Sequence, residues 1–171
     1  MLPDSAWEMA EERGVKMPAD NPEDFKKFIV VTADCRDVNE YLEKFELPLQ
    51  IMQDREAIIR TARELVIMLA EQGLVYAEIR FAPQLHTRKG MTQAEAIEAV
   101  IEGVNEGMKQ AKTIDIGIIC CTMSIGLETV NKEENLETVR ATKQYLGKGV
   151  VALDLAGAEG IVPLKNFGYI F

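Results

Sequence analysis

The chain has 171 residues, 47% of them hydrophobic, so it is long enough to bury one sizeable core. Lys and Arg number 19 against 28 Asp and Glu, a formal net charge of −9, which argues against nucleic acid and anionic membranes as partners. No stretch long enough to span a membrane is free of charge, and residues 1–13 contain neither a basic start nor an apolar run. We therefore expect no membrane span and no secretory signal peptide.

The three cysteines are Cys35, Cys120 and Cys121, and none of them forms the spaced pair that is typical of a structural zinc site. Cys120 and Cys121 are adjacent within an apolar run, where a free cysteine behaves as a small hydrophobic residue. We expect both thiols to lie in the core rather than to act as nucleophiles. An odd number of cysteines without a pairing pattern favours a reducing compartment, so we expect a cytoplasmic location.

Residues 1–50 predict short helices joined by loops. Two of these helices are expected at 23–31 and 36–45, with Pro48 following the second. Residues 54–72 predict the clearest helix, because apolar side chains recur on one wide face and Gly73 follows at the position of a C-cap.

Residues 74–82 alternate between apolar and polar side chains, which predicts a strand that ends at Pro83. Thr92 and Glu95 have the spacing of a capping box, so a helix is expected to begin there and to run to about residue 112.

Residues 114–122 are nearly all apolar, as in a strand that is buried on both faces of a parallel sheet. A helix at 135–146, a strand at 149–156 and the start of another loop and helix at 158–171 complete the pattern. Strands that alternate with helices indicate an α/β fold built from parallel βαβ units. We treat residues 1–171 as one domain.

In such folds ligands bind at the carboxyl ends of the strands, which here are the segments 80–86, 122–127 and 154–160. If Val75, Ala77, Ile79 and Phe81 face the outer helices, then Glu78 and Arg80 face the interior of the sheet. Asp154 has a matching place on the third strand. A charge inside a sheet layer must be paired or hydrated, so we expect Arg80 to pair with Asp154 or with Glu78. An ordinary structural ion pair is the alternative interpretation.

Three further features have both a functional and a structural interpretation. Gly157 follows a strand, where glycine allows either close approach to a ligand or a tight turn. His86 is the only histidine, and a lone histidine in a loop is expected to be solvated rather than to bind a metal. An apolar stripe at helical spacing, which is typical of core packing, consists of Val38, Tyr41, Leu42 and Phe45.

Several segments together resemble the adenosine deaminase family. YAEIRFAPQLH (76–86), IGIICCTMS (116–124) and VALDLAGAEG (151–160) are similar to its second, third and fourth strand segments. LPDSAWEMAEERGVKMPAD (2–20) resembles the stretch after its first strand, and DVNEYLEKF (37–45) also matches. The resemblance covers essentially the whole chain, in order.

The resemblance implies a (β/α)₈ barrel that binds zinc at its carboxyl mouth and hydrolyses adenosine or deoxyadenosine to inosine or deoxyinosine in purine salvage. Such a barrel needs about 250 residues, so we expect an incomplete barrel with strands two to four. The segments that carry the zinc ligands and the acid and base residues of the family have no counterpart here. We therefore expect no catalytic residue, no metal ligand and no cofactor on this chain itself.

The resemblance also implies substrate-side roles. Gly157 matches the glycine whose backbone approaches the purine, and Asp154 and Glu159 match positions near the mouth. Ser124 and Ile125 stand where the family has Arg-His, so the loop after the third strand departs from the family pattern. The apolar wall of the nucleoside pocket is matched by Val38, Tyr41, Leu42 and Phe45.

Three hypotheses follow. The first is a truncated adenosine deaminase homologue that is inactive alone. The second is a non-catalytic half-barrel that forms a homo-oligomer through its open sheet edges. The third is a module that binds a purine nucleoside weakly without turnover.

Overall fold

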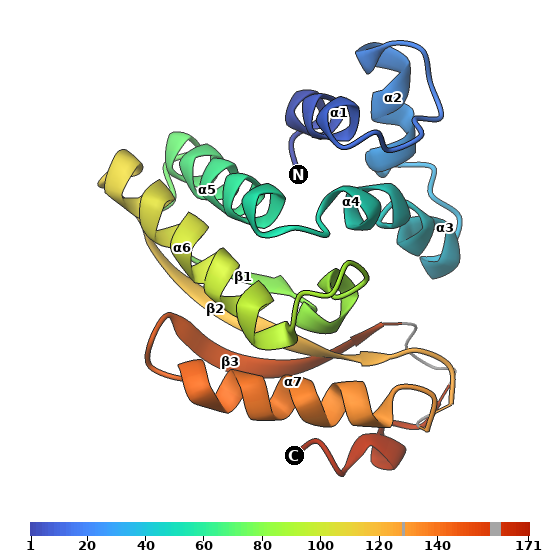
Figure 1. Cartoon of the computed structure of the whole chain (residues 1–171), viewed down its shortest axis with the longest axis vertical. Helices are drawn as coiled ribbons and strands as arrows, with labels where there is room; N and C mark the ends of the chain where they lie inside the picture. Colours follow the sequence, from blue (N-terminus) through green and yellow to red (C-terminus); the bar gives the residue numbers. More distant parts are fainter. Residues whose placement is uncertain (128, 158–161) are drawn as a thin grey trace.

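The computed structural model describes residues 1–127, 129–157 and 162–171. The chain forms an α/β fold with its helical N-terminal part beside the sheet (Figure 1). In chain order the elements are α1 (Pro3–Glu12), α2 (Pro22–Ile29), α3 (Val38–Glu43), α4 (Glu46–Ile51), α5 (Arg55–Glu71), β1 (Tyr76–Phe81), η1 (Pro83–His86), α6 (Gln93–Ala111), β2 (Asp115–Ser124), α7 (Lys132–Tyr145), β3 (Val150–Gly157) and η2 (Leu164–Phe167).

The sheet is parallel, with its three strands in the order β1-β2-β3. Helix α6 connects β1 to β2 and α7 connects β2 to β3, and both pack against β2. Helix α5 lies against α6 (Figure 1). The strand order and the parallel direction confirm the βαβ pattern that the sequence predicts.

Alternating side chains explain which face of the sheet the helices cover. On β1, Ala77, Ile79 and Phe81 pack against the main core, whereas Tyr76 and Arg80 on the opposite face are exposed. On β2 the core residues are Ile116, Ile118 and Cys120. The expectation that Val75 shares the helix-facing side is wrong, because Val75 precedes β1 and is 73% exposed.

An irregularity in the pairing of β2 with β3 sets the faces of β3. Ile118 pairs with Val150, but the next residue, Ile119, pairs with Ala152. Val151 is therefore an extra residue that forms a β-bulge, and it changes the face of the sheet on which every later side chain of β3 lies. Asp154 therefore pairs with Cys121 and shares the face that the helices leave uncovered.

The N-terminal helices enclose a second apolar cluster, which includes Met9, Phe25 and Ile51. The helix predicted for 36–45 is present as the shorter α3, and a further short helix that was not predicted, α4, follows it. Pro48 lies inside α4 rather than after a helix. It occupies the first turn, where no intrahelical partner is required for a backbone N–H, so proline is tolerated there.

Two other boundaries differ from the predicted ones. Helix α7 begins at Lys132, three residues before the predicted start at 135, and Glu133 and Glu134 supply the acidic first turn that suits a helix N-terminus. In the C-terminal segment, Leu164–Phe167 forms a 3₁₀ helix. The predicted strand at 149–156 and the capping box at Thr92 are confirmed.

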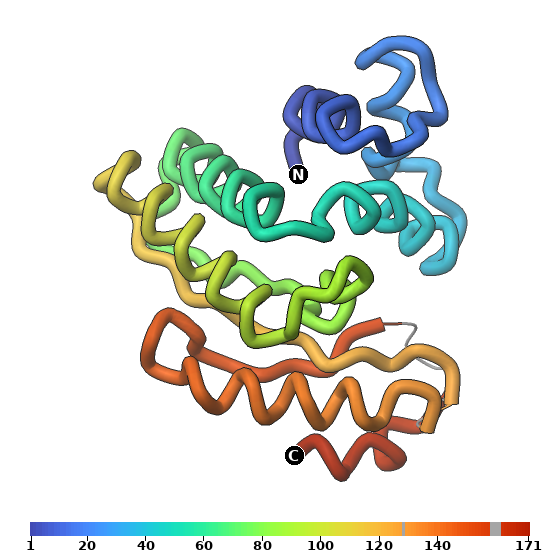
Figure 2. Tube along the Cα trace, viewed as in Figure 1, coloured from blue at the N-terminus to red at the C-terminus, as the bar shows by residue number. Residues whose placement is uncertain are grey.

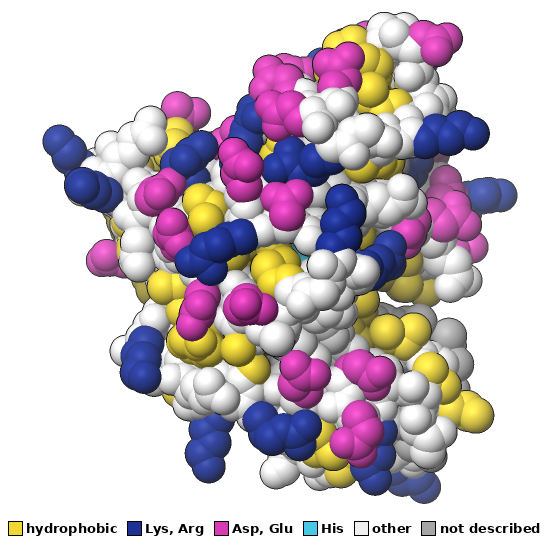
Figure 3. All heavy atoms as spheres, in the orientation of Figure 1, with side chains coloured by type: hydrophobic (Ala, Val, Ile, Leu, Met, Phe, Trp, Pro, Cys, Tyr) yellow, Lys and Arg dark blue, Asp and Glu magenta, His cyan; other side chains and the backbone are white. Residues whose placement is uncertain are grey.

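Ion pairs cross the outer surface of α5 and α6. Arg63 lies 2.9 Å from Glu106, and Arg55 pairs with Glu102. Figure 3 shows acidic and basic side chains interspersed over this side of the molecule. Among the described residues, no helix combines the length and the apolar character that crossing a membrane requires.

Asp54 caps α5 and ties it to the end of α1. Its carboxylate accepts hydrogen bonds from Arg13 Nε at 2.7 Å, from Arg13 Nη2 at 3.0 Å and from the Ala57 N–H at 2.9 Å. The bonds from Arg13 are the main cause that lowers the pKa of Asp54, against the opposing effect of burial. We expect Asp54→Ala to lower the free energy of unfolding by about 1–2 kcal/mol at pH 7, chiefly through the lost cap.

The contribution of Asp54 to the free energy of unfolding depends on pH. Because the folded-state pKa is below the unfolded value of about 3.9, the stabilisation is present above about pH 4 and is lost as the pH falls through the lowered folded-state pKa. Urea unfolding at pH 7 and about pH 3 measures the difference between Asp54→Ala and the unmodified chain. Asp20→Ala, at an exposed turn, is the control and should change stability little. An equal loss at both pH values would contradict the ionic part of this account.

Candidate functional site

The carboxyl ends of the three parallel strands lie at one edge of the sheet. Figure 2 shows the chain leaving β1, β2 and β3 on the same side of the molecule, the side on which α3 also lies. The segment 83–86 follows β1, and residues 125–131 follow β2. The predicted mouth residue Glu159 lies outside the described residues.

Arg80 and Asp154 lie on the uncovered face, and they form one of the two pairs expected from the sequence. Arg80 Nη1 is 3.3 Å from Asp154 Oδ2, and the two side chains are 57% and 38% exposed. Asp154 Oδ1 also accepts a hydrogen bond from the Leu155 N–H at 2.8 Å. A pair this exposed contributes little to stability, so its main effect is to orient two charges on this face.

Glu78 hydrogen-bonds to Tyr76 instead of Arg80, the partner that the sequence analysis considered for it. Its carboxylate accepts a hydrogen bond from the Tyr76 hydroxyl at 2.8 Å, and this bond raises the pKa of Tyr76. Cys121 lies in register with Asp154 and is only 3% exposed. Burial raises the pKa of the Cys121 thiol, which makes it a poor nucleophile.

Gly157 ends β3 in a backbone conformation that favours glycine, with φ of +131°. It pairs with Ser124. A Cβ at position 157 would also meet the Ser124 backbone, 3.1 Å from its carbonyl carbon and 3.2 Å from its nitrogen. The geometry of the strand pair therefore requires glycine here without any ligand, and contact with a purine stays a prediction.

The apolar stripe on α3 and α4 is a surface feature, so its interpretation as core packing is wrong. Val38, Tyr41 and Phe45 are 43–46% exposed, and Leu42 is half-buried. The rings of Tyr41 and Phe45 contact each other edge to face, with centroids 5.2 Å apart. Helix α3 buries none of its residues, because the N-terminal core is formed by α1, α2 and α4 instead.

His86 is buried, which contradicts the expectation of a solvated loop histidine. It is 4% exposed, its Nδ1 lies 2.8 Å from the Met52 carbonyl oxygen, and its ring packs against Phe81. Burial lowers the pKa of His86, so the ring is neutral near pH 7. The side chain joins the η1 segment to the end of α4 and has a structural role.

A network of amide side chains at the same edge was not anticipated from the sequence. Gln84, Asn131 and Asn135 hydrogen-bond to one another and to the backbone of Met123. The only sequence signal was the pair of asparagines four residues apart at the start of α7, a spacing that places both on one side of a helix.

The described residues do not fit the zinc ion that the resemblance implies. Across 1–127, 129–157 and 162–171, no three His, Cys, Asp or Glu side chains converge in a way that could hold a metal. Structural and catalytic zinc sites need three or four such ligands at one point. No chemical step that uses a metal can therefore be assigned to these residues.

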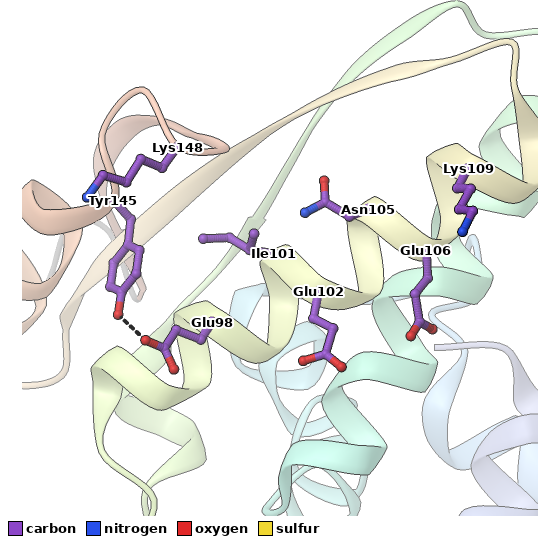
Figure 4. Close-up of a pocket in the computed structure, with 8 residues that line it drawn as sticks. All are labelled: Glu98, Ile101, Glu102, Asn105, Glu106, Lys109, Tyr145 and Lys148. Atoms are coloured by element: carbon purple, nitrogen blue, oxygen red, sulfur yellow. Dashed lines mark hydrogen bonds between the residues drawn. The ribbon is translucent and has the colours of Figure 1, made fainter.

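A shallow hollow of about 540 Å³ lies on the outer surface of α6, near Tyr145 and Lys148 (Figure 4). Tyr145 ends α7 and Lys148 precedes β3, so the hollow is near the amino end of β3. The Tyr145 hydroxyl donates a hydrogen bond of 2.6 Å to Glu98, which raises the pKa of Tyr145 to about 12. Ligands of α/β folds bind at the carboxyl ends of the strands, so this hollow is not the candidate site.

Solved structures of other proteins share the fold of this chain. An adenine deaminase from Arthrobacter aurescens superposes with a TM-score of 0.73 at 20% identity, covering 98% of this chain and 48% of that one. A structure of Arabidopsis ADAL complexed with IMP gives a TM-score of 0.73 at 24% identity, covering 97% and 47%. These likenesses show the fold, which is part of a deaminase-type barrel.

Sequence comparison shows the family. The adenosine deaminase family matches residues 1–171. An adenosine deaminase from Haemophilus ducreyi is 42% identical over 167 residues, covering 95% of this chain and 48% of that protein. The chain thus spans about half the length of the curated relatives that it matches. Because the family match covers residues 1–171, the chain belongs to the adenosine deaminase family.

Proposed function

We propose that this chain forms the substrate-side part of a deaminase barrel that hydrolyses adenosine or deoxyadenosine, and that it is inactive as 171 residues alone. The family match over residues 1–171 supports the reaction class. The 48% coverage of the Haemophilus ducreyi relative supports the partial role. Three unpaired cysteines support a cytoplasmic setting.

The observation that carries this proposal is the uncovered face of the parallel sheet. Arg80 and Asp154 lie on that face, and Gly157 ends the strand at its carboxyl edge. In a closed barrel this face becomes the interior, and the carboxyl edge becomes the mouth where the substrate binds.

The residues of this chain would bind and orient the nucleoside. The Gly157 backbone would approach the purine, and the apolar surface of Tyr41 and Phe45 would cover the ring and exclude water from it. Zinc in this family supplies an activated water, and its ligands would come from sequence other than these residues. No proton transfer is assigned to Arg80, Asp154 or Glu78.

Two measurements test the proposal. The purified chain with added zinc should not change the ultraviolet absorbance of adenosine above a zinc-only blank, and turnover would overturn its inactivity alone. A chimera in which this chain replaces the matching part of the Haemophilus ducreyi relative should deaminate adenosine. Tyr41→Ala in that chimera should raise KM, whereas Asn105→Ala, on the exposed outer side of α6, should not. A folded but inactive chimera would overturn the substrate-side role.

One observation favours a second candidate, a half-barrel that assembles with copies of itself. Tyr76 is 54% exposed and Val151 is 48% exposed on the uncovered face, and both outer strands have a free edge in the described sheet. Exposed edges and apolar patches promote association. Light scattering after size exclusion should then give at least a dimer, and a monomer at every concentration would remove this candidate.

A further inference from the structure

Strand β2 extends beyond the end of β1 on the side where β1 pairs with it. The last pair between them is Phe81 with Cys120, yet β2 continues to Ser124. Pro83 follows β1 and has no N–H to offer to β2, which explains why the ladder stops. On its other side β2 remains paired with β3 as far as Gly157. The backbone of Met123 therefore needs hydrogen-bond partners that β1 does not supply.

Asn135 of α7 supplies these partners. Its Oδ1 accepts a hydrogen bond from the Met123 N–H at 2.8 Å, and its Nδ2 donates to the Met123 carbonyl oxygen at 3.0 Å. One side-chain amide thus satisfies both backbone groups of one residue, as a neighbouring strand would do. Asn135 is fully buried, so water does not compete for these bonds.

The remaining positions of the Asn135 amide are also satisfied. Its Nδ2 donates to the Tyr169 hydroxyl oxygen at 3.1 Å, and its Oδ1 accepts from Gln84 Nε2 at 2.9 Å. Asn131 Nδ2 donates a second bond of 2.9 Å to the Met123 carbonyl oxygen. Among the described residues, Asn131 Oδ1 is a buried atom without a hydrogen-bond partner, whereas both polar atoms of the Asn135 amide are fully bonded, which fixes their geometry. The orientation of the Asn135 amide is therefore held from several elements at once.

Met123 is linked directly to the candidate site. It pairs with Ala156, and the next pair is Ser124 with Gly157. Gly157 leaves no room for a Cβ against the Ser124 backbone, so a shift of β2 at this point would shift Gly157 as well. We infer that Asn135 is a positioning residue, whose amide replaces β1 at the end of β2 and so sets the place of Gly157 at the mouth. Only the link to the purine rests on the proposed function.

The first test is amide hydrogen exchange by NMR on the unmodified chain. The Met123 amide should exchange at least about 100-fold more slowly than in an unstructured peptide, because it is bonded although no strand pairs with it on that side. Exchange at the unstructured rate would overturn the inference. This measurement needs neither a variant nor a nucleoside.

The second test is Asn135→Asp, with Asn105→Asp on the exposed side of α6 as the matched control. A carboxylate keeps the acceptor for the Met123 N–H but cannot donate to the Met123 carbonyl oxygen. Local opening at Met123 should increase about tenfold at pH 7, because one buried hydrogen bond is lost, although the Met123 carbonyl oxygen keeps the bond from Asn131. A protonated carboxyl can donate again, so the Met123 amide shift should return towards that of the unmodified chain as the pH falls. In the part of the chain that the structure describes, Asn135 contacts one ionisable side chain, Tyr169, and Lys132 lies over the Tyr169 ring.

The chimera separates this inference from the proposed function. In an active chimera, Asn135→Asp should raise KM for adenosine about tenfold with a smaller change in kcat, and Asn105→Asp should change neither. An unchanged KM together with an unchanged Met123 signal would overturn the positioning role. An inactive chimera with a protected Met123 amide would overturn the proposed function and leave the hydrogen-bonded bridge intact. If Asn135→Asp does not fold at pH 7, Gln84→Met, which removes one donor to Asn135, is expected to give a smaller change in the same direction.

Discussion

Gly103→Ala is expected to lower the free energy of unfolding by about 1–3 kcal/mol, although alanine is the better helix former. Gly103 lies on α6 where α5 crosses it. A Cβ there would overlap the Ile59 carbonyl oxygen and lie 2.9 Å from the Ala62 Cβ. Gly107, one turn later, has the same constraint, because a Cβ would lie 2.7 Å from the Val66 Cβ. Both glycines allow α5 and α6 to approach closely.

Urea unfolding followed by circular dichroism measures this effect. Asn105→Ala is a suitable control, since Asn105 is on the exposed side of the same helix and the change should be neutral or slightly stabilising. If Gly103→Ala and Asn105→Ala have the same free energy of unfolding, then α5 and α6 can move apart to accept the extra methyl group without any loss of stability. That result would contradict the close packing of the two helices.

The second large effect concerns thiol reactivity. Burial raises the pKa of Cys120 to about 11, and it also raises the pKa of Cys121. A shift of two units leaves about 100-fold less thiolate, and the thiolate is the reactive form. Cys35 is half-buried beside the start of α3, where reagent can reach it. In the native chain at about pH 8, Cys35 should react at least about 100-fold faster than Cys120, and it should also react faster than Cys121.

Alkylation with iodoacetamide, followed by mass spectrometry, tests this order. One cysteine should be modified in the folded chain, and all three cysteines should be modified in denaturant. Cys35→Ser should abolish the fast phase and leave the slow one. Rapid native modification of Cys120 or Cys121 would show that β2 opens readily, which would also weaken the case for a rigid end of that strand.

Local patterns were sufficient to predict most of the elements. Thr92 and Glu95 form the expected capping box, because a helix N-terminus depends on residues close in sequence. The apolar run at Ile116 and Ile118 forms the buried central strand, because β2 lies between β1 and β3 and these two side chains belong to the main core. Periodicity reports contacts within an element, so it predicts elements well.

The burial of individual residues was predicted poorly. His86 was expected in solvent but lies under Phe81 and Met52, and the Tyr41 stripe was expected in the core but lies on the surface. Both outcomes depend on which distant segment packs over the residue. A sequence pattern does not contain that information, because it does not say which of several apolar faces meet.

Local sequence patterns established the α/β class and the parallel direction of the strands, whereas they left Gly157 open between a ligand contact and a tight turn. Tertiary packing decided which of the two expected partners Arg80 takes, because the pairing of β3 with β2 brings Asp154 Oδ2 to 3.3 Å from Arg80 Nη1. It also decided the partner of Met123, since Asn135 comes from a helix twelve residues later in the chain. Hydrogen bonds between elements form wherever packing brings donors and acceptors together, and packing is a property of the whole fold.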